Sequence, residues 1–186
     1  MSHDVCPYWV GFWLASPVRR LLHNPEKILH SFVKTGMTVL DVGAAMGFFS
    51  LPLAQMVGPG GKVVCLDVQE KMLQALQKRA RKANLLDRIV THECGSASLG
   101  LNTFEGTIDF ALAFAVVHEV PDARSFFSEL FRAGKPGAQC LVAEPRAHVS
   151  ARDFEQTLSH AEEAGWRVVD KPRIRISQAA LLSKDL

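Results

Sequence analysis

The sequence has almost no excess of charge of one sign, since its formal net charge is +2 over 186 residues. A protein that binds nucleic acid is expected to gather basic residues on one face. Here the densest basic stretch, residues 78–82, follows an apolar stripe at helical spacing and is interpreted as the solvated end of a helix. The composition therefore predicts no nucleic-acid partner.

Cysteine is also scarce, and its four positions are scattered: Cys6, Cys65, Cys94 and Cys140. No CxxC pair occurs, the spacing that zinc sites and thiol redox motifs use. Cys65 and Cys140 lie within apolar runs, where a free cysteine behaves as a small buried hydrophobic side chain. We expect neither a disulfide framework nor a metal ion.

Long hydrophobic runs are missing as well. The apolar run Tyr8–Ala15 is too short to span a bilayer, and residues 1–4 lack the basic region of a secretory signal. Hydrophobic residues make up 48% of the chain and charged residues 22%, which is typical of a globular domain. We therefore predict a cytoplasmic protein with one domain and no integral membrane segment.

From residue 37 onward, β-branched runs alternate with amphipathic helical stretches, a pattern typical of βαβ units and a parallel sheet. Strands are predicted at Met37–Val42, Lys62–Asp67, Arg88–Glu93, Thr107–Phe114, Ala138–Ala143, Trp166–Lys171 and Ile174–Leu182. Helices are predicted at Pro17–Leu22, Pro25–Val33, Phe48–Val57, Gln69–Ala83, Ala123–Ala133 and Arg152–Ala164. No helix separates the last two strands, so we expect a hairpin that adds one antiparallel strand.

The most informative segment is a glycine-rich turn between the first strand and its helix. The strand ends at Asp41, and Gly43 and Gly47 bracket the turn. Glycine lets the backbone turn sharply and lets a ligand approach it, and the helix N-terminus beyond presents free N–H groups. The alternative is that these glycines serve packing only.

A second feature favours a ligand. Asp67 ends the next strand, 26 positions after Asp41. In nucleotide-binding sheets an acid at this place accepts hydrogen bonds from both ribose hydroxyls. The alternative role for Asp67 is to cap the helix that begins at Gln69.

These residues resemble the class I S-adenosylmethionine (SAM)-dependent methyltransferase family, from about residue 37 to the C-terminus. The resemblance rests on Val39–Gly43 with Gly47, Asp67, Ile108–Phe114 leading into Val117–Asp122, Lys135–Gly137, and Glu144 with Pro145. The subgroup of ubiquinone/menaquinone C-methyltransferases and other small-molecule methylating enzymes is the most similar.

The resemblance implies an α/β fold, a Rossmann-like doubly wound sheet of seven strands in the order 3-2-1-4-5-7-6 with strand 7 antiparallel. It also implies that residues 37–186 bind SAM across the carboxyl ends of strands 1, 2 and 4, and that S-adenosylhomocysteine is the product. The methionyl side would be lined by Asp41, Gly43, Ala44, Ala45 and Gly47, the ribose held by Asp67, the adenine framed by Val68, Cys94, Gly95 and Ser96, and the sulfonium approached by Phe114.

Two departures from the family pattern stand out. Ala45 occupies the place where the family usually has a third glycine, and the loop Glu93–Ser98 lacks the aspartate that often binds the adenine amino group. Ser96 or a backbone carbonyl is the expected substitute. NAD is the rival cofactor, but the G-x-G-x-x-G spacing is absent from Gly43–Gly47.

Methyl transfer from a sulfonium needs alignment and exclusion of water, and it needs a general base only when the acceptor carries a proton. His118, which follows the fourth strand, is the candidate base, and Glu119 beside it would orient the ring or face solvent. The structural alternative is a hydrogen bond from His118 to a backbone carbonyl. Glu144 and His148 are candidate contacts for a small-molecule acceptor, with capping or loop anchoring as their alternative roles.

Residues 1–36 stand outside the strand–helix rhythm and are predicted to form a lid. Trp9 and Trp13 would contact the acceptor, and Tyr8 is a second candidate catalytic residue, able to hydrogen-bond the acceptor or the cofactor carboxylate. Alternatively, these rings fill a groove or form a homodimer contact. Two other functions stay open: a non-catalytic SAM-binding module, and a peripheral methyltransferase of a quinone or lipid.

Overall fold

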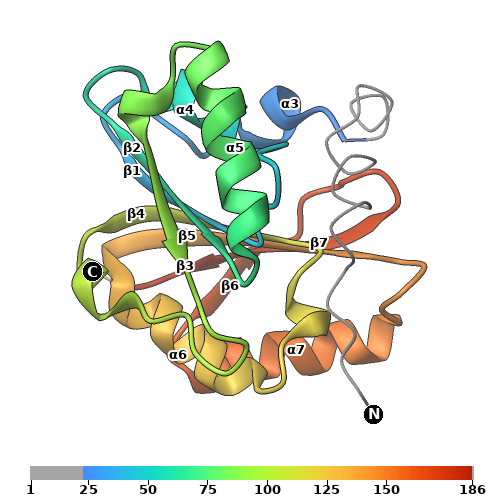
Figure 1. Cartoon of the computed structure of the whole chain (residues 1–186). Helices are drawn as coiled ribbons and strands as arrows, with labels where there is room; N and C mark the ends of the chain where they lie inside the picture. The colour runs from blue at the N-terminus through green and yellow to red at the C-terminus, as the bar shows by residue number, and fades with distance from the viewer. Residues whose placement is uncertain (1–22, 186) are drawn as a thin grey trace. The chain divides into compact units, whose positions relative to one another are not determined.

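The computed structural model describes residues 23–185, which form an α/β fold around a seven-stranded sheet (Figure 1). The strand order is β3-β2-β1-β4-β5-β7-β6, as the family resemblance implies. β7 runs antiparallel to both β5 and β6, which confirms the expected closing hairpin. The described chain divides into two compact units, with the boundary between Cys94 and Gly95.

The N-terminal unit contains β1, β2 and β3 in parallel register. Its elements are α3 (Pro25–Leu29), β1 (Thr38–Val42), α4 (Ser50–Val57), β2 (Lys62–Asp67), α5 (Glu70–Lys82), the 3₁₀ helix η1 (Leu86–Arg88) and β3 (Ile89–Glu93). α5 is amphipathic and packs Met72, Leu73 and Leu76 inward. The basic residues near its end are exposed as predicted, except Arg79, which is half-buried and donates to the carbonyl of Met46. Parallel pairing brings the carboxyl ends of the three strands to one edge.

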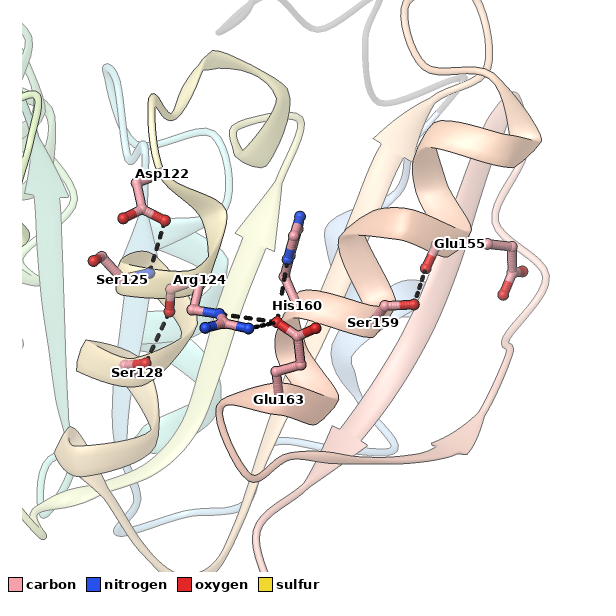
Figure 2. A network of polar contacts seen from close by, with 8 residues as sticks. All are labelled: Asp122, Arg124, Ser125, Ser128, Glu155, Ser159, His160 and Glu163. Atoms are coloured by element: carbon pink, nitrogen blue, oxygen red, sulfur yellow. Dashed lines mark hydrogen bonds and ion pairs between the residues drawn. The ribbon is translucent and has the colours of Figure 1, made fainter.

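The C-terminal unit contains β4, β5, β7 and β6. Its elements are η2 (Leu101–Phe104), β4 (Ile108–Phe114), η3 (Val117–Glu119), α6 (Ala123–Ala133), β5 (Gly134–Pro145), α7 (Ala151–Glu163), β6 (Arg167–Asp170) and β7 (Ser177–Ser183). α6 and α7 lie side by side (Figure 1). Their exposed ends are joined by Arg124, which donates to the Glu163 carboxylate (Figure 2).

Several boundaries differ from the sequence-based prediction. β5 begins at Gly134 and includes the segment Lys135–Gly137 that was expected to be a turn. The pairing of β4 with β5 accommodates this extra length through a register shift between Ile108 and Phe110. α3 ends at Leu29. β7 begins at Ser177, directly after Ile176, whose φ of 57° lies in the left-handed region and not in the extended region that this side chain would need in a strand.

The cores of both units are apolar. The inner strands β2 and β4 are buried on nearly every residue, whereas the edge strands β3 and β6 have no fully buried residue. Cys65 and Cys140 are buried and free, as predicted, and burial raises the pKa of the Cys140 thiol to about 12. Neither thiol is therefore reactive near neutral pH. Across the described part of the chain, every helix falls short of the length and hydrophobicity that crossing a membrane requires.

Candidate functional site

The turn after β1 depends on backbone conformations that favour glycine. Gly43 and Gly47 have φ values of 71° and 84°, in the left-handed region. At Gly47 a Cβ atom would also lie 3.0 Å from Cγ of Leu76, so α5 packs directly on this glycine. The packing role and the turn role of Gly47 are therefore both real.

Ala45 occupies the middle of the same turn in a conformation that is unusual for alanine. Its φ is 45°, although its side chain carries the Cβ that the left-handed region disfavours. This is the position where the family usually has glycine. The chain therefore keeps the backbone shape of that glycine at a cost in strain.

Asp67, at the end of β2, holds this turn in place. The N–H of Ala44 donates to the carbonyl of Leu66 at 2.8 Å, so the chain follows β2 past the end of β1. The N–H of Ala45 then donates to Oδ2 of Asp67 at 2.9 Å. Oδ1 accepts the N–H of Gln69, also at 2.9 Å. Gln69 itself is the N-cap residue of α5 and no side chain caps the helix, so Asp67 closes the turn before α5 and does not cap it.

The Asp67 carboxylate keeps acceptor capacity that these two backbone bonds do not use. It is 8% exposed, and burial raises its pKa from the ordinary value. Each carboxylate oxygen has two lone pairs. One lone pair of Oδ2 accepts the N–H of Ala45, and one lone pair of Oδ1 accepts the N–H of Gln69. The remaining lone pairs suit a vicinal diol, which supplies two hydroxyl donors.

Asp41, in contrast, makes a structural contact within the turn. The hydroxyl of Ser50, the first residue of α4, donates to Oδ2 of Asp41 at 2.5 Å, and both residues are buried. This bond joins the end of β1 to the start of α4. Burial and the nearby Asp41 charge raise the pKa of the Cys65 thiol.

The predicted adenine contacts lie at the ends of β2 and β3. Val68 is 37% exposed, and Cys94 donates its N–H to the carbonyl of Asp67 at 3.1 Å. Gly95 and Ser96 follow and are exposed. Their contact with adenine stays a prediction.

Glu129 of α6 is a structural residue that the sequence analysis missed. It accepts the N–H groups of Leu99 and Gly100 at 3.1 and 3.0 Å and the Ser98 hydroxyl at 3.2 Å. Its signal in the sequence is weak, because a glutamate on an amphipathic helix normally faces solvent. These hydrogen bonds hold the loop over residues 98–100 against α6.

The turn after β4 brings together His118, Glu144 and His148. Oε2 of Glu144 lies 2.5 Å from Nδ1 of His118, and Oε1 accepts the N–H of Val117 at 2.8 Å. The carboxylate of Glu144 is 1% exposed, whereas His118 is 24% exposed. The hydrogen bond to Glu144 raises the pKa of His118 above its ordinary value of 6.5.

The surroundings of His118 contain two more titratable groups. Glu119 lies 4.0 Å from Nε2, and the ring of His148 packs edge-on with its centroid 5.7 Å away. The backbone-carbonyl bond considered from the sequence is thus replaced by a carboxylate bond. Acceptor contacts by Glu144 and His148 stay predictions.

Other predicted site residues have different outcomes. Phe114 is buried at the end of β4, and its approach to a sulfonium stays a prediction. Tyr8, Trp9 and Trp13 lie outside the described residues. Within residues 23–185, no group of three or more His, Cys, Asp or Glu side chains is arranged to hold a metal ion.

Comparison with known proteins agrees with this geometry. A family profile described as a methyltransferase domain matches residues 33–178. Among curated proteins, a ubiquinone/menaquinone biosynthesis C-methyltransferase from Escherichia fergusonii is 31% identical over 117 residues, which is 61% of this chain and 45% of that protein. A demethylmenaquinone methyltransferase from a Geobacillus species is 29% identical over 126 residues, 68% of this chain and 53% of that protein. The match thus spans about half the length of these relatives.

One solved structure matches over almost its whole length. The crystal structure of a SAM-dependent methyltransferase from Aquifex aeolicus has a TM-score of 0.85 and 30% sequence identity, covering 96% of this chain and 99% of that chain. The family profile covers most of the chain, including the glycine turn, Asp67 and the His118–Glu144 pair. The chain belongs to the class I SAM-dependent methyltransferase family.

Proposed function

We propose that this chain transfers a methyl group from SAM to a small-molecule acceptor. Bound SAM would supply a methyl group attached to a sulfonium sulfur. After the transfer that sulfur would be the thioether of the leaving group, S-adenosylhomocysteine. The protein's own task is to bind and orient the reactants and to exclude water.

The observation that carries this proposal is the bond between Ala45 N–H and Asp67 Oδ2. It joins the glycine turn to the acid at the end of β2, the two features that a nucleoside cofactor needs on the same sheet edge. Asp67 would hold the ribose through its remaining lone pairs. Gly43 and Ala45, whose positive φ values shape the turn, would bring backbone close to the methionyl part.

Isothermal titration calorimetry with SAM and with S-adenosylhomocysteine tests the proposal. Asp67→Ala removes the acceptor of both ribose hydroxyls, so we expect affinity to fall by about 100-fold. Glu70→Gln is the matched control, since this exposed carboxylate lies three residues away in the first turn of α5. Its affinity should equal that of the wild type.

Two results would contradict the proposal. One is a wild-type chain that binds neither ligand. The other is an Asp67→Ala variant that keeps a native circular dichroism spectrum and binds as tightly as the wild type. Tight binding without methyl transfer to any acceptor would instead favour a non-catalytic SAM-binding module.

A further inference from the structure

The bonds of Glu144 define which nitrogen of His118 carries hydrogen. An ionised carboxylate only accepts hydrogen bonds, so its partner Nδ1 must be an N–H. The Val117 N–H occupies the other carboxylate oxygen, which fixes the rotation of the Glu144 side chain. In the neutral ring, Nε2 is therefore left with a free lone pair, the form a general base requires.

Burial of Glu144 restricts the motion of its side chain and so keeps its hydrogen bond to His118 in place. Glu144 is 1% exposed and the β4–β5 pairing fixes its backbone, with Ala143 opposite Phe114. His118 is 24% exposed, so its ring is reachable while the carboxylate behind it is not. The same division of exposure is seen in catalytic pairs where a buried acid orients a histidine.

We propose that Glu144 is a positioning residue for His118, and that this pair accepts the proton of a phenol- or enol-type hydroxyl on the methyl acceptor. The inference rests on the proposed function and names its acceptor class. The acceptor O–H bond breaks and its proton joins Nε2. The electron pair left on the acceptor forms the new bond to the methyl carbon, either from the oxygen or from a ring carbon next to it, and the carbon–sulfur pair stays on sulfur. On the carbon route the methylated ring carbon then loses its hydrogen as a proton, and the oxygen regains a proton.

The acceptor class follows from matching acidities. A phenol has a pKa of about 10, within about four pKa units of an ordinary histidine. The raised pKa of His118 makes the difference between the two pKa values smaller. An aliphatic alcohol is a far weaker acid than a phenol, so the same imidazole would take its proton much less readily. A thiol acceptor is partly ionised near pH 8 and needs no such pair.

The groups that face the ring set the pH dependence. They are Glu144 from β5, His148 from the segment after β5, and Glu119 from η3 itself. The two carboxylates favour the protonated ring. Below the raised pKa both nitrogens carry hydrogen, so base function must increase as pH rises through that pKa.

Nitrogen-15 NMR of the histidine side chains tests the pair without any acceptor. In the wild type, Nδ1 of neutral His118 should carry the hydrogen. Glu144→Gln keeps an oxygen for the Val117 N–H but turns an amide NH₂ donor toward Nδ1. We expect the hydrogen to move to Nε2 and the pKa of His118 to fall.

Glu129→Gln is the matched control, because Glu129 is a buried glutamate that accepts backbone N–H bonds but contacts no histidine ring in the described bonds. It should leave the tautomer and pKa of His118 unchanged. The inference is overturned if Nε2 carries the hydrogen in the wild type, or if Glu144→Gln changes neither property.

Methyl-transfer assays test the acceptor class, with catechol, 1,4-dihydroxynaphthalene and 4-hydroxybenzoate as hydroxyl probes and thiophenol as the ionised comparison. Glu144→Gln and His118→Asn should each lower kcat on a hydroxyl probe by about 100-fold or more. SAM affinity should stay within about 3-fold of the wild type, and thiophenol turnover should fall at least about 10-fold less than turnover of the hydroxyl probe. The acid limb of the kcat profile should move to lower pH in Glu144→Gln.

Failure here is distinguishable from failure of the proposed function. If the wild type binds SAM but methylates none of the three hydroxyl probes, or if both variants methylate them at the wild-type rate, the acceptor class is wrong. If the wild type binds no SAM, the proposed function itself fails.

Discussion

The turns after β1 and β4 are held by the same two contacts, a backbone hydrogen bond to the neighbouring strand and a carboxylate that accepts an N–H of the turn. After β1, Ala44 N–H bonds the Leu66 carbonyl at 2.8 Å, and Asp67, the next residue, accepts the N–H of Ala45. After β4, the N–H of Ala115 bonds the Ala143 carbonyl at 2.7 Å. Glu144, the residue after Ala143, accepts the N–H of Val117.

In each turn an alanine adopts a left-handed backbone, with φ of 45° at Ala45 and 57° at Ala115. In each, a carboxylate from the neighbouring parallel strand satisfies a backbone donor that the turn leaves unpaired. The first role of each strand-end acid is therefore to hold the adjacent turn in place by accepting one of its backbone N–H groups.

The two acids differ in what the second oxygen holds. Asp67 uses it for a backbone N–H, that of Gln69, so the first turn presents a fixed acceptor. Glu144 uses it for the ring of His118, so the second turn presents a group that titrates. The first arrangement suits holding a polar ligand, and the second suits moving a proton.

The largest effect on stability is expected from removing the two acids in turn. Glu144→Ala leaves a buried N–H and a half-buried ring nitrogen without partners, so unfolding free energy should fall by about 3 kcal/mol. Asp67→Ala leaves two N–H groups closer to solvent, and a loss of about 1–2 kcal/mol is expected. Urea denaturation measures both. Equal losses would contradict the different burial of the two sites.

A smaller effect should follow from replacing the strained alanines. Ala45→Gly and Ala115→Gly each relieve a left-handed conformation, worth about 1–2 kcal/mol, but give the unfolded chain more freedom. A net gain of up to about 1 kcal/mol in unfolding free energy is expected. Ala44→Gly, next to Ala45 but without a positive φ, should lose stability instead. A loss in all three variants would show that the turns store no such strain.

The smallest effect is expected at a third carboxylate, on the molecular surface. Glu163 accepts from Arg124 and lies 3.6 Å from Nδ1 of His160 (Figure 2). Water screens this exposed pair, so Glu163→Gln should not measurably change the melting temperature. A clear drop in the melting temperature, measured by calorimetry, would mean that α6 and α7 depend on the ion pair. It would contradict the expectation that the exposed Glu163 contributes less to stability than the buried Asp67 and Glu144.

Much of the fold could be predicted from the sequence, because its signals are local. The alternation of apolar strands with amphipathic helices, Gly43 and Gly47, and the position of Asp67 at a strand end all lie within short segments. The strand order then followed from family resemblance, and the observed sheet confirms it. The start of β5 could not be predicted, because Lys135–Gly137 has the composition of a turn and only pairing with β4 extends the strand.

The sequence by itself determined the glycine turn, the acid at the end of β2 and the histidine after β4, since each depends on neighbouring residues along the chain. Only the tertiary structure decided that Glu144 holds His118, 26 positions away, and that Glu129 fastens the loop at residues 98–100. The physical reason is register. Which side chains meet across parallel strands depends on pairing, and the register shift between Ile108 and Phe110 arises only when β4 pairs with β5.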